Sequence, residues 1–165
     1  MKRRVLLDTN LLIKALDQGS STDPEERQLA KQRLAELLTD DSVRFAITPL
    51  IRYEFLRKVG WDDYERYQTL EASLKEFQEF IIDKDVSDIA TGLYRLDAFE
   101  SASTNSDKNI DKRKFDTFHL AVAKCNDLEL ASDDSDIAKL EPLYERLIEE
   151  RVHLAKDNTN NEENT

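Results

Sequence analysis

The stretch Val5-Leu6-Leu7-Asp8-Thr9-Asn10 decides the fold, because it places an acid directly behind a short apolar run. Residues 3–7 have the length and composition of a buried strand, so Asp8 stands at its carboxyl end. A carboxylate at such an apolar junction is costly to desolvate unless it is paired. Asp8 either caps a helix that starts at Thr9 or Asn10, or it belongs to a site that binds a ligand.

Strand and helix patterns alternate from this first strand onward. Asp23-Pro24 and Thr48-Pro49 each predict a capped helix start. Further strands are predicted at 43–47, 80–82, 128–131 and 152–154, with helices at 62–80, from Asp85, at 115–126 and at 137–148. The alternation predicts a three-layer α/β/α domain, with a mostly parallel sheet of four to five strands covered on both faces.

The chain boundaries follow from composition. Residues 1–155 are expected to form one domain, and the polar residues 156–165 a disordered tail. Residues 101–114 are polar and without periodicity, which predicts a loop. No apolar run is long enough to cross a membrane, Asp8 interrupts any signal-peptide pattern, and Cys125 is the single cysteine. These features favour a protein of the cytoplasm.

The net charge of −11 argues against a nucleic-acid partner, because phosphate binding requires a basic surface. Two observations weaken that objection. Carboxylates that bind a divalent cation add negative charge which the cation then neutralises. Basic residues also cluster at 2–4 and at Lys108, Lys112, Arg113 and Lys114, where they form either a solvated surface or a contact for phosphates.

Three further acidic segments follow along the chain, each with a structural explanation and a functional one. Glu54 interrupts an apolar helix, and it either pairs with a neighbouring cation or serves a site. Asp116 opens a helix of small and apolar residues, where the helix dipole alone favours an acid. Asp133, Asp134 and Asp136 share one strand-to-helix turn, which is more than a single cap requires. His119, one turn after Asp116, is interpreted as a packed residue.

The order of these motifs resembles that of the PIN-domain nucleases, in particular the VapC-type toxins of toxin–antitoxin pairs. The likeness covers about residues 4–140 and rests on Leu-Asp-Thr-Asn at 7–10, Glu54, Phe-Asp-Thr-Phe-His-Leu-Ala at 115–121 and Ala-Ser-Asp-Asp-Ser-Asp-Ile at 131–137. Phe115 replaces the usual alanine, Ile137 replaces the usual phenylalanine, and residues 101–114 resemble an insertion.

The resemblance implies the roles of individual residues. The implied catalytic acids are Asp8, Glu54, Asp116 and Asp134, and the implied metal ligands are Asp8, Asp116, Asp134 and Asp136. Spacing favours Asp134 over Asp133 as the fourth ligand. Thr9 and Asn10 are implied to orient the first acid, Asp8, and Ser132, the small hydroxyl of the last motif, is also implied to orient the site. Hard oxygen ligands select Mg²⁺ or Mn²⁺.

The resemblance also implies a reaction and partners. It implies an endoribonuclease in which water attacks an RNA phosphodiester and leaves 5′-phosphate and 3′-hydroxyl ends. Lys112, Arg113 and Lys114 are predicted to hold the RNA backbone. A cognate antitoxin and a homodimer, with an interface on the Tyr- and Leu-rich helices between residues 50 and 80, are further expectations. The alternative is a PIN-like module that binds RNA or protein without cutting it.

Overall fold

The computed structural model describes residues 2–104, 113–132 and 134–162, with side chains up to Arg151. The chain divides into two compact units. The first contains Met1–Lys84 and Val122–Asp134, and the second contains Asp85–Ala121 and Ser135–Thr165. In this part of the chain no helix is long and apolar enough to cross a membrane.

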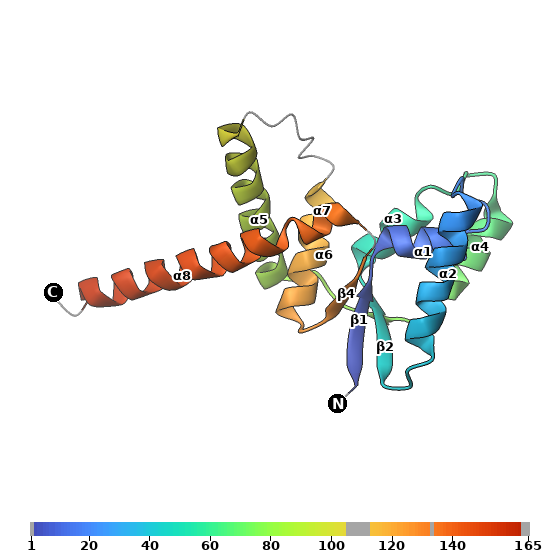
Figure 1. Cartoon of the computed structure of the whole chain (residues 1–165), viewed down its shortest axis with the longest axis horizontal. Helices are drawn as coiled ribbons and strands as arrows, with labels where there is room; N and C mark the ends of the chain where they lie inside the picture. Colours follow the sequence, from blue (N-terminus) through green and yellow to red (C-terminus); the bar gives the residue numbers. More distant parts are fainter. Residues whose placement is uncertain (1, 105–112, 133, 163–165) are drawn as a thin grey trace. The chain divides into compact units, whose positions relative to one another are not determined.

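The first unit is built on a parallel sheet of four strands in the order β3-β2-β1-β4 (Figure 1). The strands are β1 (Arg3–Leu7), β2 (Val43–Ile47), β3 (Gln78–Glu79) and β4 (Glu129–Ala131). Val5 is opposite Phe45 on one side and Glu129 on the other. The sheet and its flanking helices confirm the predicted α/β class, with four parallel strands among the described residues.

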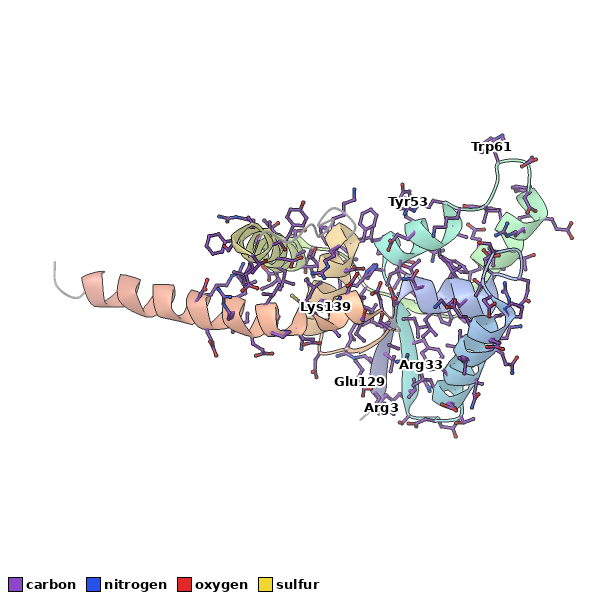
Figure 2. All side chains as sticks on the ribbon, turned by 45° about the horizontal axis from the view of Figure 1, so that its top comes forward. Arg3, Arg33, Tyr53, Trp61, Glu129 and Lys139 are labelled. Atoms are coloured by element: carbon purple, nitrogen blue, oxygen red, sulfur yellow. The ribbon has the colours of Figure 1, made fainter. Side chains whose placement is uncertain are left out.

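The central position of β1 follows from its sequence. Val5, Leu6 and Leu7 are at most 1% exposed, as expected of a parallel strand covered on both faces. Arg3, at the amino end of β1, donates from Nε and Nη2 to the two carboxylate oxygens of Glu129 on β4, at 2.8 and 2.7 Å (Figure 2). The apolar run therefore forms the core, and its charged start pairs with the neighbouring strand.

Among the described residues, four helices lie wholly within this unit. They are α1 (Thr9–Leu16), α2 (Pro24–Leu38), α3 (Pro49–Leu56) and α4 (Tyr64–Ser73). The side chain of Asp23 accepts from two backbone N–H groups at the start of α2, and Thr48 Oγ1 accepts from Ile51 N at the start of α3. Both predicted helix starts are confirmed, with proline in the first turn of each helix.

Two predicted boundaries in this region were wrong. The helix expected over 62–80 ends at Ser73, and the strand expected at 80–82 is β3 at Gln78–Glu79. Phe80 N still donates to Ile47 O at 2.9 Å, but Ile81 is 72% exposed. The apolar triplet 80–82 therefore leaves the sheet edge after its first residue, and apolar composition alone did not reveal this.

The second unit is helical and is built around α5 (Lys84–Ser103) and α8 (Glu141–Glu162), with α7 (Ser135–Ala138) between them and most of α6 (Lys114–Cys125). A stripe of buried residues follows α5 at helical spacing: Val86, Ile89, Ala90, Leu93 and Asp97. Gly92 lets α8 approach closely, since a Cβ there would lie 2.8 Å from Leu147 Cδ2. An ion pair joins Arg146 to Glu100 along the same contact.

The end of the chain also differs from the prediction. Residues 152–154 are part of α8, so the fifth strand predicted there was wrong. The helix continues through Glu162, across most of the segment expected to be a disordered tail, whereas 163–165 lie outside the described residues. Extending an existing helix needs no new nucleation step. Of the predicted loop 101–114, residues 101–103 and 114 are helical and 105–112 lie outside the described residues.

Candidate active site

Asp8 lies at the carboxyl end of the central strand and is 2% exposed. It occupies the residue before α1, but its side chain makes no capping hydrogen bond to that helix. Instead, Oδ2 of Asp8 accepts a hydrogen bond from Oγ of Ser132 at 2.9 Å. The capping explanation for this carboxylate is therefore wrong. Asp8 is a buried acid whose hydrogen-bond donor, Ser132, follows a different strand.

Ser132 follows β4, the strand that pairs with β1. Because Leu7 is opposite Ala131 in this parallel pair, the residues that follow the two strands meet at one edge of the sheet. Oγ of Ser132 donates to Asp8 and accepts from the backbone N–H of Asp134 at 2.9 Å. One hydroxyl thus connects the first acid to the last acidic motif.

Glu54 approaches the same edge from α3, the helix that follows β2. Its Oε2 accepts a hydrogen bond from Oγ1 of Thr9 at 3.0 Å, and Thr9 is 6% exposed. Thr9 was expected to orient Asp8, its neighbour in the chain, whereas the structure gives its hydroxyl to Glu54. Asn10 is exposed. The acids that follow β1 and β2 are therefore connected through consecutive residues of one helix start.

The last motif is only partly described. Asp134 is half-buried and is fixed through its backbone by Ser132, whereas Asp133 lies outside the described residues. The choice between these two acids as a ligand stays a prediction from spacing.

Asp116 and Asp136 belong to the second unit. Asp116 is half-buried in the first turn of α6. The carboxylate of Asp136 accepts from Lys139 Nζ at 2.6 Å and from Arg113 Nη2 at 3.3 Å. The hydrogen bond from Lys139, with the charge of Arg113, holds the pKa of Asp136 below its usual value. Two cationic side chains therefore already neutralise this carboxylate. The geometry favours a structural ion pair for Asp136 over the predicted role as a metal ligand.

Of the three residues predicted to bind RNA, Arg113 requires correction. Its side chain is 6% exposed, and Nη1 lies 3.1 Å from both carboxylate oxygens of Asp97. A guanidinium that is buried and paired in this way is not available to a phosphate. Lys114 is exposed, with its ammonium 5.5 Å from the ring centroid of Phe115, and Lys112 lies outside the described residues.

The Asp97–Arg113 pair was missed because its two members look unrelated in the sequence. A signal was present, since Asp97 continues the apolar stripe of α5 one turn after Leu93, where a solvated acid is not expected. His119 is 1% exposed, which agrees with its interpretation as a packed residue.

The chemistry of the donors can be compared with the needs of a hard cation. Asp8 and Glu54 supply carboxylate oxygens, and Mg²⁺ is commonly held by one or two carboxylates with water and substrate phosphate completing the shell. Across residues 2–104, 113–132 and 134–162, no group of three or more Asp, Glu, His or Cys residues is already arranged around a cation position. The donors of the first unit fit Mg²⁺ or Mn²⁺ in kind.

Comparisons with known proteins agree with this description. A family model described as PIN domain matches residues 5–142. A toxin–antitoxin complex from Klebsiella pneumoniae has a similar fold, with 23% identity and a TM-score of 0.54 over 79% of this chain and 87% of that one. VapBC2 from Rickettsia felis, bound to a DNA fragment from its promoter, matches with 12% identity and a TM-score of 0.57 over 84% and 93% of the two chains. No curated protein matches the sequence.

Proposed function

Because the chain belongs to the PIN-domain family, we propose that it is an endoribonuclease dependent on Mg²⁺ or Mn²⁺ and the toxin of a toxin–antitoxin pair. The observation that carries this proposal is the buried carboxylate of Asp8. It stands at the carboxyl end of the central strand, bonded to Ser132 and next to the Thr9–Glu54 pair. Ligands of parallel sheets collect at that edge, and a purely structural acid has no need of a second carboxylate there.

Individual residues take distinct parts in this proposal. Asp8, Glu54 and Asp134 would hold the cation, and Asp116 remains a predicted fourth acid from its motif. A bound cation lowers the pKa of its water and neutralises charge that develops on the phosphate. Ser132 fixes the direction in which the Asp8 carboxylate points, and Thr9 does the same for Glu54. Asp133 remains the alternative to Asp134.

The direct test is RNA cleavage by the purified full chain. With Mn²⁺ and a structured RNA, we expect new ends that carry a 5′-phosphate, detectable by ligation to an adaptor that requires this group. Chelation with EDTA should abolish the cleavage, and added Mn²⁺ should restore it. A folded chain that leaves tRNA, rRNA and mRNA intact in Mn²⁺ would support the alternative, a PIN-like module that binds without cutting.

Ser132→Ala tests whether the hydroxyl serves the cation site. Partners that orient metal ligands typically contribute 10–100-fold to metal affinity. Loss of the Ser132 bond to Asp8 should therefore raise the Mn²⁺ concentration for half-maximal cleavage by about 10-fold or more. Ser103→Ala removes an exposed hydroxyl that bonds only within its own helix, to Phe99 O. An equal Mn²⁺ requirement for these two variants would contradict the assigned role.

The proposed partners rest on the structural neighbours and on the exposed surface. One neighbour is a toxin–antitoxin complex by its description and the other is VapBC2, which supports a cognate antitoxin as a partner. We expect this antitoxin to present a basic side chain to the acids. Tyr64 and Tyr67 on α4 are 65% and 37% exposed. They supply the apolar surface for a homodimer. We further propose that the protein acts in the cytoplasm.

A further inference from the structure

A hollow of about 450 Å³ lies in the first unit, beside the start of α1. Asn10 and Lys14 line it on α1, and residues 20–22 line it on the loop that follows. Lys58, just after α3, and Arg66, on α4, also line it. Its lining is predominantly polar. Of the residues in the sequence motifs, Asn10 lines this hollow, whereas none of the acids Asp8, Glu54 or Asp134 contributes to its wall.

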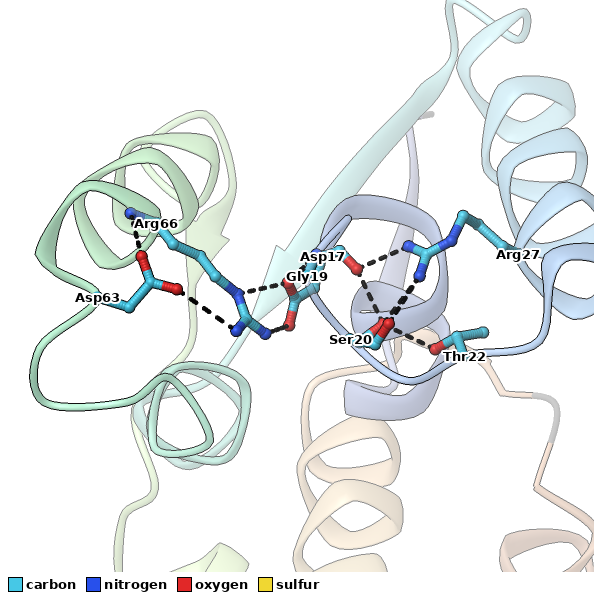
Figure 3. Close-up of polar contacts among 7 residues, drawn as sticks. All are labelled: Asp17, Gly19, Ser20, Thr22, Arg27, Asp63 and Arg66. Atoms are coloured by element: carbon cyan, nitrogen blue, oxygen red, sulfur yellow. Dashed lines mark hydrogen bonds and ion pairs between the residues drawn. The ribbon is translucent and has the colours of Figure 1, made fainter.

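The walls are held in place by a network around Asp17 (Figure 3). Arg66 donates from Nε and Nη2 to the two carboxylate oxygens of Asp17 at 2.9 and 2.7 Å. Arg27 donates to the backbone oxygen of Asp17 at 2.6 Å and to that of Ser20 at 3.1 Å. Gly19 leaves room for the guanidinium in this position, since a Cβ there would lie 2.6 Å from Arg66 Nε. The loop between α1 and α2 is therefore fixed to α4 before any ligand arrives.

The charge of the hollow is opposite to that of the whole chain. Asp17 is its one acidic lining residue, and this buried carboxylate is neutralised by Arg66. Two ammonium groups remain. Lys14 has Glu26 at 3.4 Å, an acid whose side chain is 56% exposed, and Lys58 has no carboxylate within ion-pair distance among the described residues. In a chain of net charge −11, a hollow with two such lysines favours an anion.

The position of the two lysines connects the hollow to the acids. Lys14 lies one helical turn after Asn10 on α1, and Asn10 is two residues after Asp8. Lys58 is four residues after Glu54, just beyond the end of α3. A helical turn advances about 5.4 Å, so each lysine follows one of the two acids by between one and two turns of chain.

We propose that this hollow binds backbone phosphates of single-stranded RNA next to the bond that is cut, with Lys14 and Lys58 as the phosphate contacts. The inference rests on the proposed nuclease function and assigns the surface along which its substrate binds. Tyr53 and Trp61, 55% and 101% exposed, extend into solvent before and after Lys58 (Figure 2). Exposed aromatic side chains a few residues from a lysine that contacts phosphate suit single-strand binding, because unpaired bases stack on them.

The test measures binding separately from cleavage. Fluorescein-labelled octauridylate is titrated with the full chain carrying Asp8→Asn, so that the RNA stays intact, at several salt concentrations. Adding Lys14→Gln and Lys58→Gln together should weaken binding at least 10-fold. Each phosphate contact on a single strand contributes about 0.7 to the slope of log affinity against log salt, so the slope should fall by about 1.4.

The matched control is the pair Lys31→Gln and Lys75→Gln in the same background. These lysines are exposed, and their loss changes the net charge equally. The inference is overturned if the two double variants bind octauridylate with equal affinity and equal salt slope. Failure of the nuclease proposal gives a different result. In that case the chain with Asp8 intact would cut no RNA, while the binding of octauridylate would still depend on Lys14 and Lys58.

Discussion

Asp8→Asn is expected to lower the rate of RNA cleavage about 10³-fold or more, which corresponds to about 4 kcal/mol of transition-state stabilisation. The substitution keeps the size of the side chain and an oxygen that can accept from Ser132 Oγ, now at 2.9 Å from Asp8. It removes the negative charge that a cation at this edge requires. The measurement is the single-turnover cleavage rate in saturating Mn²⁺.

The control for Asp8 is Asp41→Asn, an equal change of charge at an exposed position before β2. This variant should cleave at the wild-type rate. Circular dichroism should show both variants folded. A folded Asp8→Asn variant that cleaves RNA within a few-fold of wild type would exclude the proposed site, because every other part of the proposal depends on this carboxylate.

The second large effect concerns stability. Asp97→Ala removes the buried partner of Arg113, whose side chain is 6% exposed. Among the described residues, the guanidinium then keeps the 3.3 Å ion pair with Asp136, a side chain that is 44% exposed and neutralises it less. Removing one member of a buried ion pair typically costs about 3–5 kcal/mol, because the remaining charge stays desolvated. We therefore expect the free energy of unfolding, measured by urea titration, to fall by that amount.

Two variants separate the pair from general damage to α5 and α6. Glu149→Ala, at an exposed position on α8, should change the free energy of unfolding by no more than about 0.5 kcal/mol. Replacing both members, Asp97→Leu with Arg113→Met, should recover most of the loss, because no unpaired charge remains. A double variant as unstable as Asp97→Ala would show that shape, and not charge, is what this site requires.

The features that the sequence predicted correctly are those with a local cause. The run Val5-Leu6-Leu7 is apolar on both faces and forms the central strand. Asp23-Pro24 and Thr48-Pro49 start helices, because the oxygen acceptor and the missing N–H act within one turn. The rule that strand ends share an edge brings Asp8 and Ser132 together, although nothing in the sequence specifies their hydrogen bond.

The incorrect predictions have non-local causes. Val152-His153-Leu154 has the composition of a strand, but it continues a helix that is already formed. Arg113 was assigned to RNA with its basic neighbours, whereas its contact is Asp97, 16 residues earlier in the chain. The hydroxyl of Thr9 bonds to Glu54, 45 residues away, and not to the adjacent acid. Long-range partners of this kind depend on packing, which residue spacing does not encode.

The hydrogen bond between Ser132 and Asp8 also has a consequence for synthesis of the chain. The two residues are 124 positions apart, and β4 is the last strand to be made. At about 5–20 residues per second, a ribosome needs about 6–25 s after Asp8 before Ser132 exists. During that time β1 can pair with β2, but the edge that holds Asp8 has no β4 beside it. A chain interrupted before residue 129 therefore lacks the Ser132 contact, and the acids take up their final arrangement only as translation nears its end.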